Sequence, residues 1–280
     1  MKVRRSNRLV DMTRYLMEHP RDLVSLKFFG QRYGSAKSSI SEDLSIIRHT
    51  VSSWGVGRLE TLPGASGGAR LTPLYSQENA EAVIKQLTAA VNDDSRLLPG
   101  GYVYLSDLLG RPDILREVGR LIATQYVDQD VDVIMTVETK GIPIAQSVAM
   151  YLNRPFVIVR NSSHITEGST VSVNYVSGSS RRIKKMELSR RTMREGANVV
   201  IVDDFLKGGG TMNGMQSLIH EFGAHVVGMN VFAEGQFKGS RLVDNCTSLI
   251  EVQAEDGRNK HISAQAGNYL EKVFGEKKEN

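Results

Sequence analysis

The hydrophobic and polar positions along the chain divide it into two regions with different periods. Residues 1–74 hold short stretches in which apolar side chains recur every three or four positions, which predicts helices. From Ile114 onwards, apolar runs of strand length alternate with helical stretches, and this alternation predicts a mostly parallel sheet with helices on both faces. We therefore expect a small helical domain followed by a larger α/β domain.

Three helices are predicted in the first region. The first covers residues 8–17, where apolar side chains and the Thr methyl follow helical spacing. The second is predicted over residues 25–33. The third opens at Ser38 or Ser39, because Ser39 and Glu42 fit a capping box in which each side chain satisfies an unpaired N–H group of the other residue.

A β-hairpin is predicted after the third helix. Residues 56–62 and 69–73 read as strands joined by a glycine-rich tip. Three helices followed by a hairpin make a winged helix-turn-helix, in which the start of the third helix enters the major groove of DNA. A generic three-helix interaction module is the alternative. The predicted DNA-binding residues are Arg4, Arg5, Lys37, Ser38, Ser39, Ser41, Arg58 and Arg70.

The positive charge of the chain is concentrated at its amino end. Residues 1–73 contain 12 Lys and Arg against 6 Asp and Glu, a net charge of +6, whereas the whole chain carries +4. The remaining residues therefore carry −2. This asymmetry is typical of a polyanion-binding module on a near-neutral body, and it favours the DNA-binding interpretation of the first region.

Three parts of the chain follow from these patterns. We expect a winged-helix domain over residues 1–74, a connection over 75–98 with a helix read from 76 to 96, and an α/β domain over 99–280. The strands predicted in the last part are Val131–Val137, Phe156–Val159, Val199–Val202, Val226–Val231 and Ser248–Val252.

One segment combines a strand with chemistry that suits a phosphorylated sugar. Residues 199–202 are apolar and β-branched, and the carboxylates of Asp203 and Asp204 follow at the carboxyl end of this strand. The glycines at 208–210 let backbone N–H groups close around a phosphate, and the helix predicted next adds its N-terminal dipole. The acid pair would then face ribose hydroxyls. An ordinary connection between a strand and a helix is the alternative.

Other candidate residues fall at the same sheet edge, because ligands bind beyond the carboxyl ends of parallel strands. Lys140 follows a predicted strand and would pair with phosphate charge. Tyr102 would stack on a ligand ring, with partly buried packing as the alternative. The predicted ligand-binding residues are Tyr102, Thr139, Lys140, Gly141, Arg160, Asp203, Asp204, Phe205, Lys207, Gly208, Gly209, Gly210 and Thr211.

A basic hairpin is predicted between these motifs. Residues 160–194 hold 8 Lys and Arg against 2 Glu, and Val171, Val173 and Tyr175 alternate with polar residues. Mobile hairpins of this kind close over sites, so this flap would face pyrophosphate or DNA. A solvated basic face is the alternative.

Composition limits the classes of protein to consider. No apolar run is long enough to cross a membrane, and residues 1–14 lack the apolar core of a signal peptide. The single cysteine, Cys246, rules out an internal disulfide, so we expect a reducing cytoplasm. His164, His220 and His225 show no metal-ligand spacing, and we expect no metal site built by the protein.

Two sets of segments carry a resemblance to known families. Residues 199–211 resemble the 5-phosphoribosyl-1-pyrophosphate (PRPP) loop of type I phosphoribosyltransferases, and residues 138–143 resemble their pyrophosphate loop. The whole chain resembles the purine operon repressors of Gram-positive bacteria. The segments that carry this second resemblance are residues 4–6, 36–43, 98–102, 166–172, 174–180 and 203–205.

The resemblance implies a winged helix joined to a type I phosphoribosyltransferase-like domain, in a cytoplasmic homodimeric repressor of purine synthesis and transport genes. It implies that double-stranded operator DNA is the partner and that PRPP is an effector that weakens DNA binding. It also suggests that guanosine tetraphosphate-type alarmones compete for the same pocket. No cofactor is obligatory, and Mg²⁺ would enter with the diphosphate. PRPP would release DNA either by occupying a basic channel or by moving the flap.

A purine phosphoribosyltransferase with a regulatory DNA-binding extension is the competing function. Active transferases usually have Thr or Ser at the place of Gly208 and a small residue at that of Lys207. Without that hydroxyl one phosphate contact is lost, while Lys207 adds a cation where bound polyphosphate would lie. The resemblance therefore implies effector binding without turnover.

Overall fold

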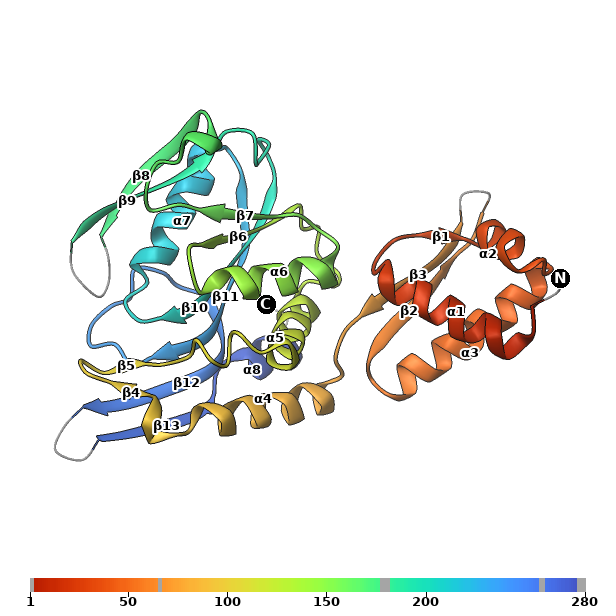
Figure 1. Ribbon diagram of the computed structural model, residues 1–280, viewed down its shortest axis with the longest axis horizontal. Coiled ribbons are helices and arrows are strands. Elements are labelled where there is room, and N and C mark those ends of the chain that lie inside the picture. Colours follow the sequence, from red (N-terminus) through yellow and green to blue (C-terminus); the bar gives the residue numbers. More distant parts are fainter. Residues whose placement is uncertain (1–2, 65–66, 177–181, 257–259, 276–280) are drawn as a thin grey trace.

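The computed structural model describes residues 3–64, 67–176, 182–256 and 260–275, which form two domains joined by a short linker (Figure 1). The smaller domain lies at the amino end and the larger one follows the linker. The elements of the smaller domain are α1 (Arg5–Glu18), β1 (Val24–Ser25), α2 (Leu26–Tyr33), α3 (Lys37–Ser53), β2 (Gly57–Leu62) and β3 (Gly68–Pro73).

Three helices pack on a small antiparallel sheet in the amino-terminal domain, so the predicted winged helix is confirmed. Strand β1 pairs with β3, and β3 pairs with β2, which gives the order β1-β3-β2. The domain is held together by apolar side chains from all of these layers, including Met12, Phe29, Leu44 and Leu71. Residues 65 and 66, at the tip of the predicted wing, lie outside the described residues.

The capping box predicted for α3 is wrong. The helix begins at Lys37, after Ala36 as its N-cap, and no side chain makes a capping hydrogen bond there. Ser39 is therefore inside the first turn, where it has helical dihedral angles and cannot act as a cap. By contrast, Ser25 caps α2 through a 3.1 Å hydrogen bond accepted from the Phe28 N–H, so α2 begins one residue later than predicted.

The larger domain is built around a six-stranded sheet in the order β13-β12-β11-β10-β6-β7. All of its described neighbours are parallel except β12 and β13. Its elements are α4 (Gln77–Val91), β4 (Leu97–Leu98), β5 (Tyr102–Val103), α5 (Pro112–Gln125), β6 (Val133–Val137), α6 (Gly141–Leu152), β7 (Phe156–Val159), β8 (Thr170–Val176), β9 (Ile183–Ser189), β10 (Asn198–Leu206), α7 (Gly210–Glu221), β11 (His225–Gly235), β12 (Cys246–Asp256), β13 (Lys260–Ala266) and α8 (Tyr269–Phe274), with one-turn 3₁₀ helices at Asp94–Arg96 and Ile165–Glu167.

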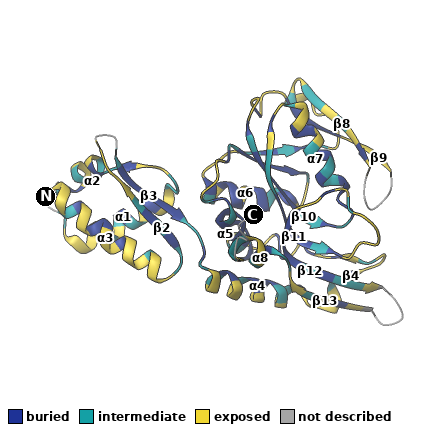
Figure 2. Cartoon of the chain, turned by 180° about the vertical axis from the view of Figure 1, so that it is seen from behind, coloured by how far each residue is buried: buried dark blue, intermediate teal, exposed yellow. Residues whose placement is uncertain are grey.

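Strand β10 shows how the sheet builds a core on each face. Because successive strand residues point to opposite faces, Val200 and Val202 join the cluster under α4, α5, α6 and α8, whereas Val199 and Ile201 join the cluster under α7 and the β8–β9 hairpin. All four side chains are fully buried. The central strands accordingly appear as buried ribbons between helices in Figure 2.

The connection between the domains differs from the single helix predicted over residues 76–96. Helix α4 ends at Val91, and a 3₁₀ turn and the short β4–β5 pair follow it. The apolar clusters of the larger domain begin at Tyr75, and the cluster of the smaller domain ends at Leu71, so the two domains have separate cores among the described residues. None of the helices described is long and apolar enough to cross a membrane.

Candidate effector and DNA-binding sites

The glycine-rich loop after β10 makes a tight turn into α7. Gly209 has φ +81°, a left-handed conformation that favours glycine, and it is the N-cap of α7. A Cβ on Gly209 would lie 3.0 Å from a methyl carbon of Val243, and the Leu242 N–H donates to the Gly208 carbonyl at 3.1 Å. The loop between β11 and β12 thus holds the turn from behind, leaving the N-terminus of α7 as a place for an anion.

The two carboxylates of the motif differ in environment. Asp203 is 6% exposed, and its Oδ1 accepts the backbone N–H of Asp204 at 2.9 Å. Asp204 is more open and lies 3.9 Å from the Lys140 ammonium. Burial, and next the neighbouring Asp204 charge, raise the pKa of Asp203 well above its ordinary range. A sugar hydroxyl placed at these carboxylates would supply a hydrogen-bond donor to a poorly solvated group.

The loop after β6 approaches the acid pair closely. The peptide bond between Glu138 and Thr139 is cis, and α6 begins two residues later. A Cβ on Gly141 would lie 2.1 Å from the Thr136 hydroxyl oxygen and 3.0 Å from a carboxylate oxygen of Asp203. The start of α6 is therefore in direct contact with the acid pair, as the two sequence motifs predicted.

A cavity of about 210 Å³ lies where these loops meet. Two of its lining residues contact each other: the ammonium of Lys207 is 5.5 Å from the centre of the Tyr102 ring. Nine of the predicted residues line the cavity, namely Tyr102, Lys140, Asp204, Phe205, Lys207, Gly208, Gly209, Gly210 and Thr211. The other lining residues, which sequence reasoning missed, are Gly101, Val103, Leu105, Leu206 and Met212.

Four predicted residues do not line this cavity. Asp203 and Gly141 lie behind it in the contact just described, and Thr139 is exposed. Arg160 instead forms ion pairs with Glu138 at 3.3 Å and Glu167 at 3.5 Å. Arg160 thus connects the loop after β6 to the segment that leads into the flap.

The predicted flap is an antiparallel hairpin formed by β8 and β9. Tyr175 and Met186 pack on α7, where a Cβ on Gly214 would approach both side chains within 3.0 Å. Lys184 and Lys185 are exposed, and Lys185 pairs with the buried Glu187 at 2.6 Å. Residues 177–181 lie outside the described residues, and the mobility of the hairpin stays a prediction.

A groove of about 610 Å³ separates the start of α3 from the wing. Two of the predicted DNA-binding residues, Lys37 and Ser41, line it, while Ser38 is exposed and Ser39 half-buried at the same helix start. The groove residues are Ser25, Leu26, Lys27, Gly30, Gln31, Lys37, Ser41, Thr61, Leu62, Pro63, Gly64 and Gly67. Sequence reasoning missed Lys27 and Gln31, whose spacing of four residues on the polar side of α2 was the available signal.

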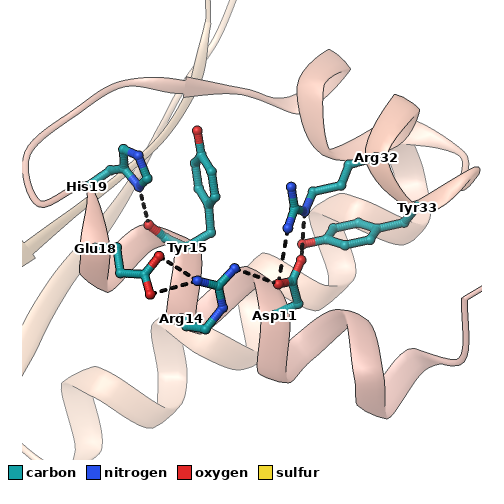
Figure 3. A network of polar contacts seen from close by, with 7 residues as sticks. All are labelled: Asp11, Arg14, Tyr15, Glu18, His19, Arg32 and Tyr33. Carbon is teal, nitrogen blue, oxygen red and sulfur yellow. Dashed lines mark hydrogen bonds and ion pairs between the residues drawn. The ribbon is translucent and has the colours of Figure 1, made fainter.

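A polar network fixes α2 on α1 beside this groove (Figure 3). Asp11 accepts hydrogen bonds from Arg32 at 2.7 Å and from the Tyr33 hydroxyl at 2.9 Å, and it also pairs with Arg14. These hydrogen bonds, that from Arg32 first, hold the pKa of Asp11 well below its usual range. Burial, and then the hydrogen bond to Asp11, raise the pKa of Tyr33 to about 12.

Two predicted DNA contacts are at the start of α1. Arg4 is exposed as the N-cap of that helix. Arg5 forms ion pairs with Asp43 at 3.0 Å and with Glu42 at 3.5 Å, while the buried Arg8 holds the other oxygen of Asp43 at 2.8 Å. Arg5 therefore connects α1 to α3 in this arrangement.

The DNA contacts predicted for Arg58 and Arg70, the arginines of the wing strands, stay predictions. Arg58 forms ion pairs with Asp128 of the larger domain and with Glu60 at 3.8 Å. Arg70 lies opposite Glu60 in the β2–β3 ladder. The pKa of Arg21 is lowered first by burial, then by the charge of Arg154 and then by the charge of Arg70. Both arginines thus belong to the side of the wing that faces the larger domain.

The fold and the sites define a two-domain protein in which a winged helix is attached to a type I phosphoribosyltransferase-like domain. The family model described as bacterial purine repressor, N-terminal, matches residues 4–73, and the phosphoribosyl transferase domain model matches residues 105–267. An adenine phosphoribosyltransferase structure from Thermoanaerobacter pseudethanolicus superposes with a TM-score of 0.51 at 21% identity, covering 60% of this chain and 99% of that chain. This likeness supports the fold alone.

Relatives that match over nearly the whole chain identify the family within this class of two-domain proteins. The chain is 52% identical to the purine biosynthesis transcriptional repressor PurR of Bacillus subtilis, over 96% of this chain and 95% of that protein. It is 48% identical to the purine biosynthesis transcriptional activator PurR of Lactococcus lactis, over 98% of this chain and 100% of that protein. The chain belongs to this family of purine biosynthesis transcriptional regulators. The family resemblance predicted from the sequence is confirmed.

Proposed function

We propose that this chain is a homodimeric repressor that binds operator DNA of purine synthesis and transport genes through its winged helix, and that PRPP weakens this binding. The relatives include proteins named as a repressor and as an activator. We choose repression because the relative with 52% identity bears that name. The competing view, a purine phosphoribosyltransferase with a DNA-binding extension, draws on the match of residues 105–267 to the transferase domain.

One observation carries the effector assignment: a single cavity collects an acid, two lysines and a glycine-rich helix N-terminus. The 5-phosphate of PRPP would lie over Gly208–Thr211, with its charge opposite the N-terminal dipole of α7. Asp203 and Asp204 would accept from the ribose hydroxyls. Lys140 and Lys207 would meet the pyrophosphate, because they border the same cavity. Alarmones of the guanosine tetraphosphate type carry the same diphosphate chemistry and would compete there.

The chemistry of the loop favours binding over turnover. Gly208 offers a backbone N–H but no hydroxyl to the phosphate, and Lys207 adds a charge that stabilises bound polyphosphate before any reaction. Among the residues that the structure describes, no group of three or more His, Cys, Asp or Glu is arranged to hold a metal ion. Any Mg²⁺ would therefore be held by diphosphate oxygens and water.

The winged helix supplies the DNA-binding face. Lys27 and Lys37 border the groove between the helices and the wing, and Ser38 and Ser41 are exposed at the start of α3. Lysines that contact phosphates supply affinity, and short polar side chains at the helix start supply base contacts. Arg4 extends the same positive end of the molecule.

The test is binding of the full chain to a purine-operon control region at fixed salt, with and without PRPP and Mg²⁺, because phosphate-dominated affinity varies steeply with salt. We expect sequence-selective binding that PRPP weakens. A parallel assay would follow pyrophosphate release from PRPP with adenine, guanine, hypoxanthine or xanthine. Robust turnover, or the absence of selective DNA binding, would overturn the proposal in favour of the transferase.

A further inference from the structure

Helix α6 joins the candidate effector site to the DNA-binding domain. It begins at Gly141, against the acid pair, and ends at Leu152. The next residue, Asn153, has φ +51° and donates from its side-chain amide to an Asp22 carboxylate oxygen at 2.8 Å. Asp22 lies in the loop between α1 and β1. Twelve helical residues span roughly 18 Å, so one helix connects two distant loops.

The N-terminal end of α6 is packed so closely that a displacement of the helix start cannot be absorbed locally. A Cβ on Gly141 would collide with the Thr136 hydroxyl at 2.1 Å and would lie 3.0 Å from a carboxylate oxygen of Asp203. Lys140, immediately before the helix, lies 3.9 Å from Asp204. A sugar diphosphate that engages Asp203, Asp204 and Lys140 would replace this ion pair with contacts to itself. Such a ligand would therefore act directly on the contacts that hold the helix start.

Helix α5 is locked to α6 along its length. The Ser147 hydroxyl donates to the Leu115 carbonyl at 2.6 Å, and a Cβ on Gly119 would lie only 2.1 Å from the Ser147 oxygen. Such close packing makes the two helices move together, because packed interiors transmit displacement rather than absorb it.

The far end of α5 also contacts the DNA-binding domain. The Arg21 guanidinium donates to the Tyr126 carbonyl at 3.2 Å, directly after α5. The Arg120 side chain donates to the Val56 carbonyl, at the start of the wing, and lies 4.4 Å from the centre of the Tyr75 ring in the linker. The two helices of the larger domain therefore present their carboxyl ends to the loop before β1 and to the base of the wing.

The receiving loop is attached to the wing. Arg21 has φ +65°, a left-handed conformation that a non-glycine residue keeps only when its surroundings hold it. Its N–H donates to the Leu71 carbonyl of β3 at 2.8 Å. A shift of Arg21 and Asp22 would therefore be passed directly to a strand of the wing.

We propose that the α5–α6 pair transmits occupancy of the sugar diphosphate site to the winged helix, through the Asn153–Asp22 and Tyr126–Arg21 hydrogen bonds. This inference rests on the proposed function and adds its mechanism of regulation. The ligand changes the position of the helix start, and the carboxyl ends of the helices change the orientation of the wing. Differential binding of PRPP to the two orientations then appears as a change in DNA affinity.

The test uses the full chain carrying Asn153→Ala or Asp22→Ala, with Kd for operator DNA measured with and without PRPP, and Kd for PRPP measured alone. We expect PRPP binding to be unchanged, and the PRPP-induced fold-change in operator Kd to shrink by about threefold or more. Asp22→Asn keeps an oxygen that accepts from Asn153 and should retain the full response. Asp130→Ala is the matched control, because that exposed carboxylate pairs with Arg154 inside the larger domain.

The outcomes separate this inference from the proposed function. If the unmodified chain shows no PRPP effect on DNA binding, the proposed function fails. If it shows the effect and both alanine variants keep it in full, the coupling through α6 is wrong. Hydrogen exchange on the unmodified chain is independent of variant folding: PRPP should change exchange at residues 21–24 and 153–154, and unchanged exchange there would overturn the inference.

Discussion

Lys207 and Tyr102 both line the candidate effector cavity, and the Lys207 ammonium lies 5.5 Å from the centre of the Tyr102 ring. The ring is 53% exposed, so the pair is open to a ligand. The attraction between a cation and the face of an aromatic ring holds the lysine over the cavity without neutralising its charge. The lysine can thus be positioned in advance for a polyphosphate.

We expect Lys207→Ala to raise the Kd for PRPP by about ten- to a hundredfold, since a charged hydrogen bond contributes about 1.5–3 kcal/mol and each 1.4 kcal/mol is a factor of ten. Tyr102→Ala should raise it by roughly two- to fivefold, because the cation–ring attraction contributes about 0.5–1 kcal/mol at an exposed site. Tyr102→Phe keeps the ring and should change nothing. Isothermal titration with PRPP checks the set, and equal effects of the two Tyr102 variants would contradict it.

Asp203→Asn should weaken PRPP binding and yet stabilise the larger domain at pH 7. The pKa of Asp203 is raised in the folded protein, so folding disfavours the ionised form. The resulting loss of stability is absent below the unfolded pKa of 3.8 and grows as the pH rises above it. The amide removes the charge but keeps the acceptor for the Asp204 N–H. We therefore expect the variant to have a larger free energy of unfolding than the unmodified chain at pH 7.

Denaturant unfolding at pH 7 and pH 4 measures this gain, which should be smaller at pH 4. A variant that is less stable than the unmodified chain at both pH values would show that the buried carboxylate is stabilised by its surroundings.

Asp11→Asn should destabilise the winged helix. Hydrogen bonds from Arg32 and then Arg14 lower the pKa of Asp11, so its contribution is present above the unfolded value of 3.8 and is lost as the pH falls below it. Since Asp11 is partly exposed, solvent screening limits the loss to about 1 kcal/mol at pH 7. Thermal unfolding of the variant against Asp22→Asn, an exposed acid outside the network in Figure 3, checks the effect. Equal melting curves at pH 7 would show that the network does not stabilise the domain.

Gly141→Ala should weaken PRPP binding strongly. The new Cβ would meet the Thr136 hydroxyl at 2.1 Å, and the start of α6 would have to move away from the acid pair. Adding Thr136→Ala removes the nearest atom, so the double variant should recover part of the affinity. Equilibrium binding of PRPP to the single and double variants measures this, and full affinity in the single variant would mean that the loop is not part of the site.

Lys37→Ala should weaken operator binding evenly across sequences and lower the slope of log Kd against log salt by about 0.9, which corresponds to one phosphate contact. Lys85→Ala is the control, because Lys85 is exposed on α4, outside the groove. Filter binding at several salt concentrations gives both slopes. An unchanged slope for Lys37→Ala would place DNA elsewhere on the domain.

The sheet was predictable where local pattern determines it. Residues 199–202 are buried because the strand has helices on both faces, and their β-branched run indicates this directly. The prediction ended β10 too early, because Phe205 and Leu206 continue the ladder with β11 past the acid pair. Carboxylates at a site interrupt the apolar pattern without ending the strand.

Other features depend on partners that are distant in sequence. The sequence analysis missed the edge strand β13, because among its residues with described burial only Ile262 has a large buried side chain. The strand is defined instead by its antiparallel pairing with β12. The side of the wing on which Arg58 lies was not predictable, because Asp128 is 70 residues away. The cavity residues were predictable in large part, because two strand-to-helix loops carry them and parallel strands bring such loops together.

The winged helix keeps a hydrophobic core of its own, and the boundary with the larger domain is bridged mainly by hydrogen bonds and ion pairs. Water can replace contacts of this kind, whereas parting a shared core would expose apolar surface. The domain can therefore swing away and return on its linker at low cost. A DNA-binding domain attached in this way would contact DNA non-specifically in one orientation and bind an operator in another.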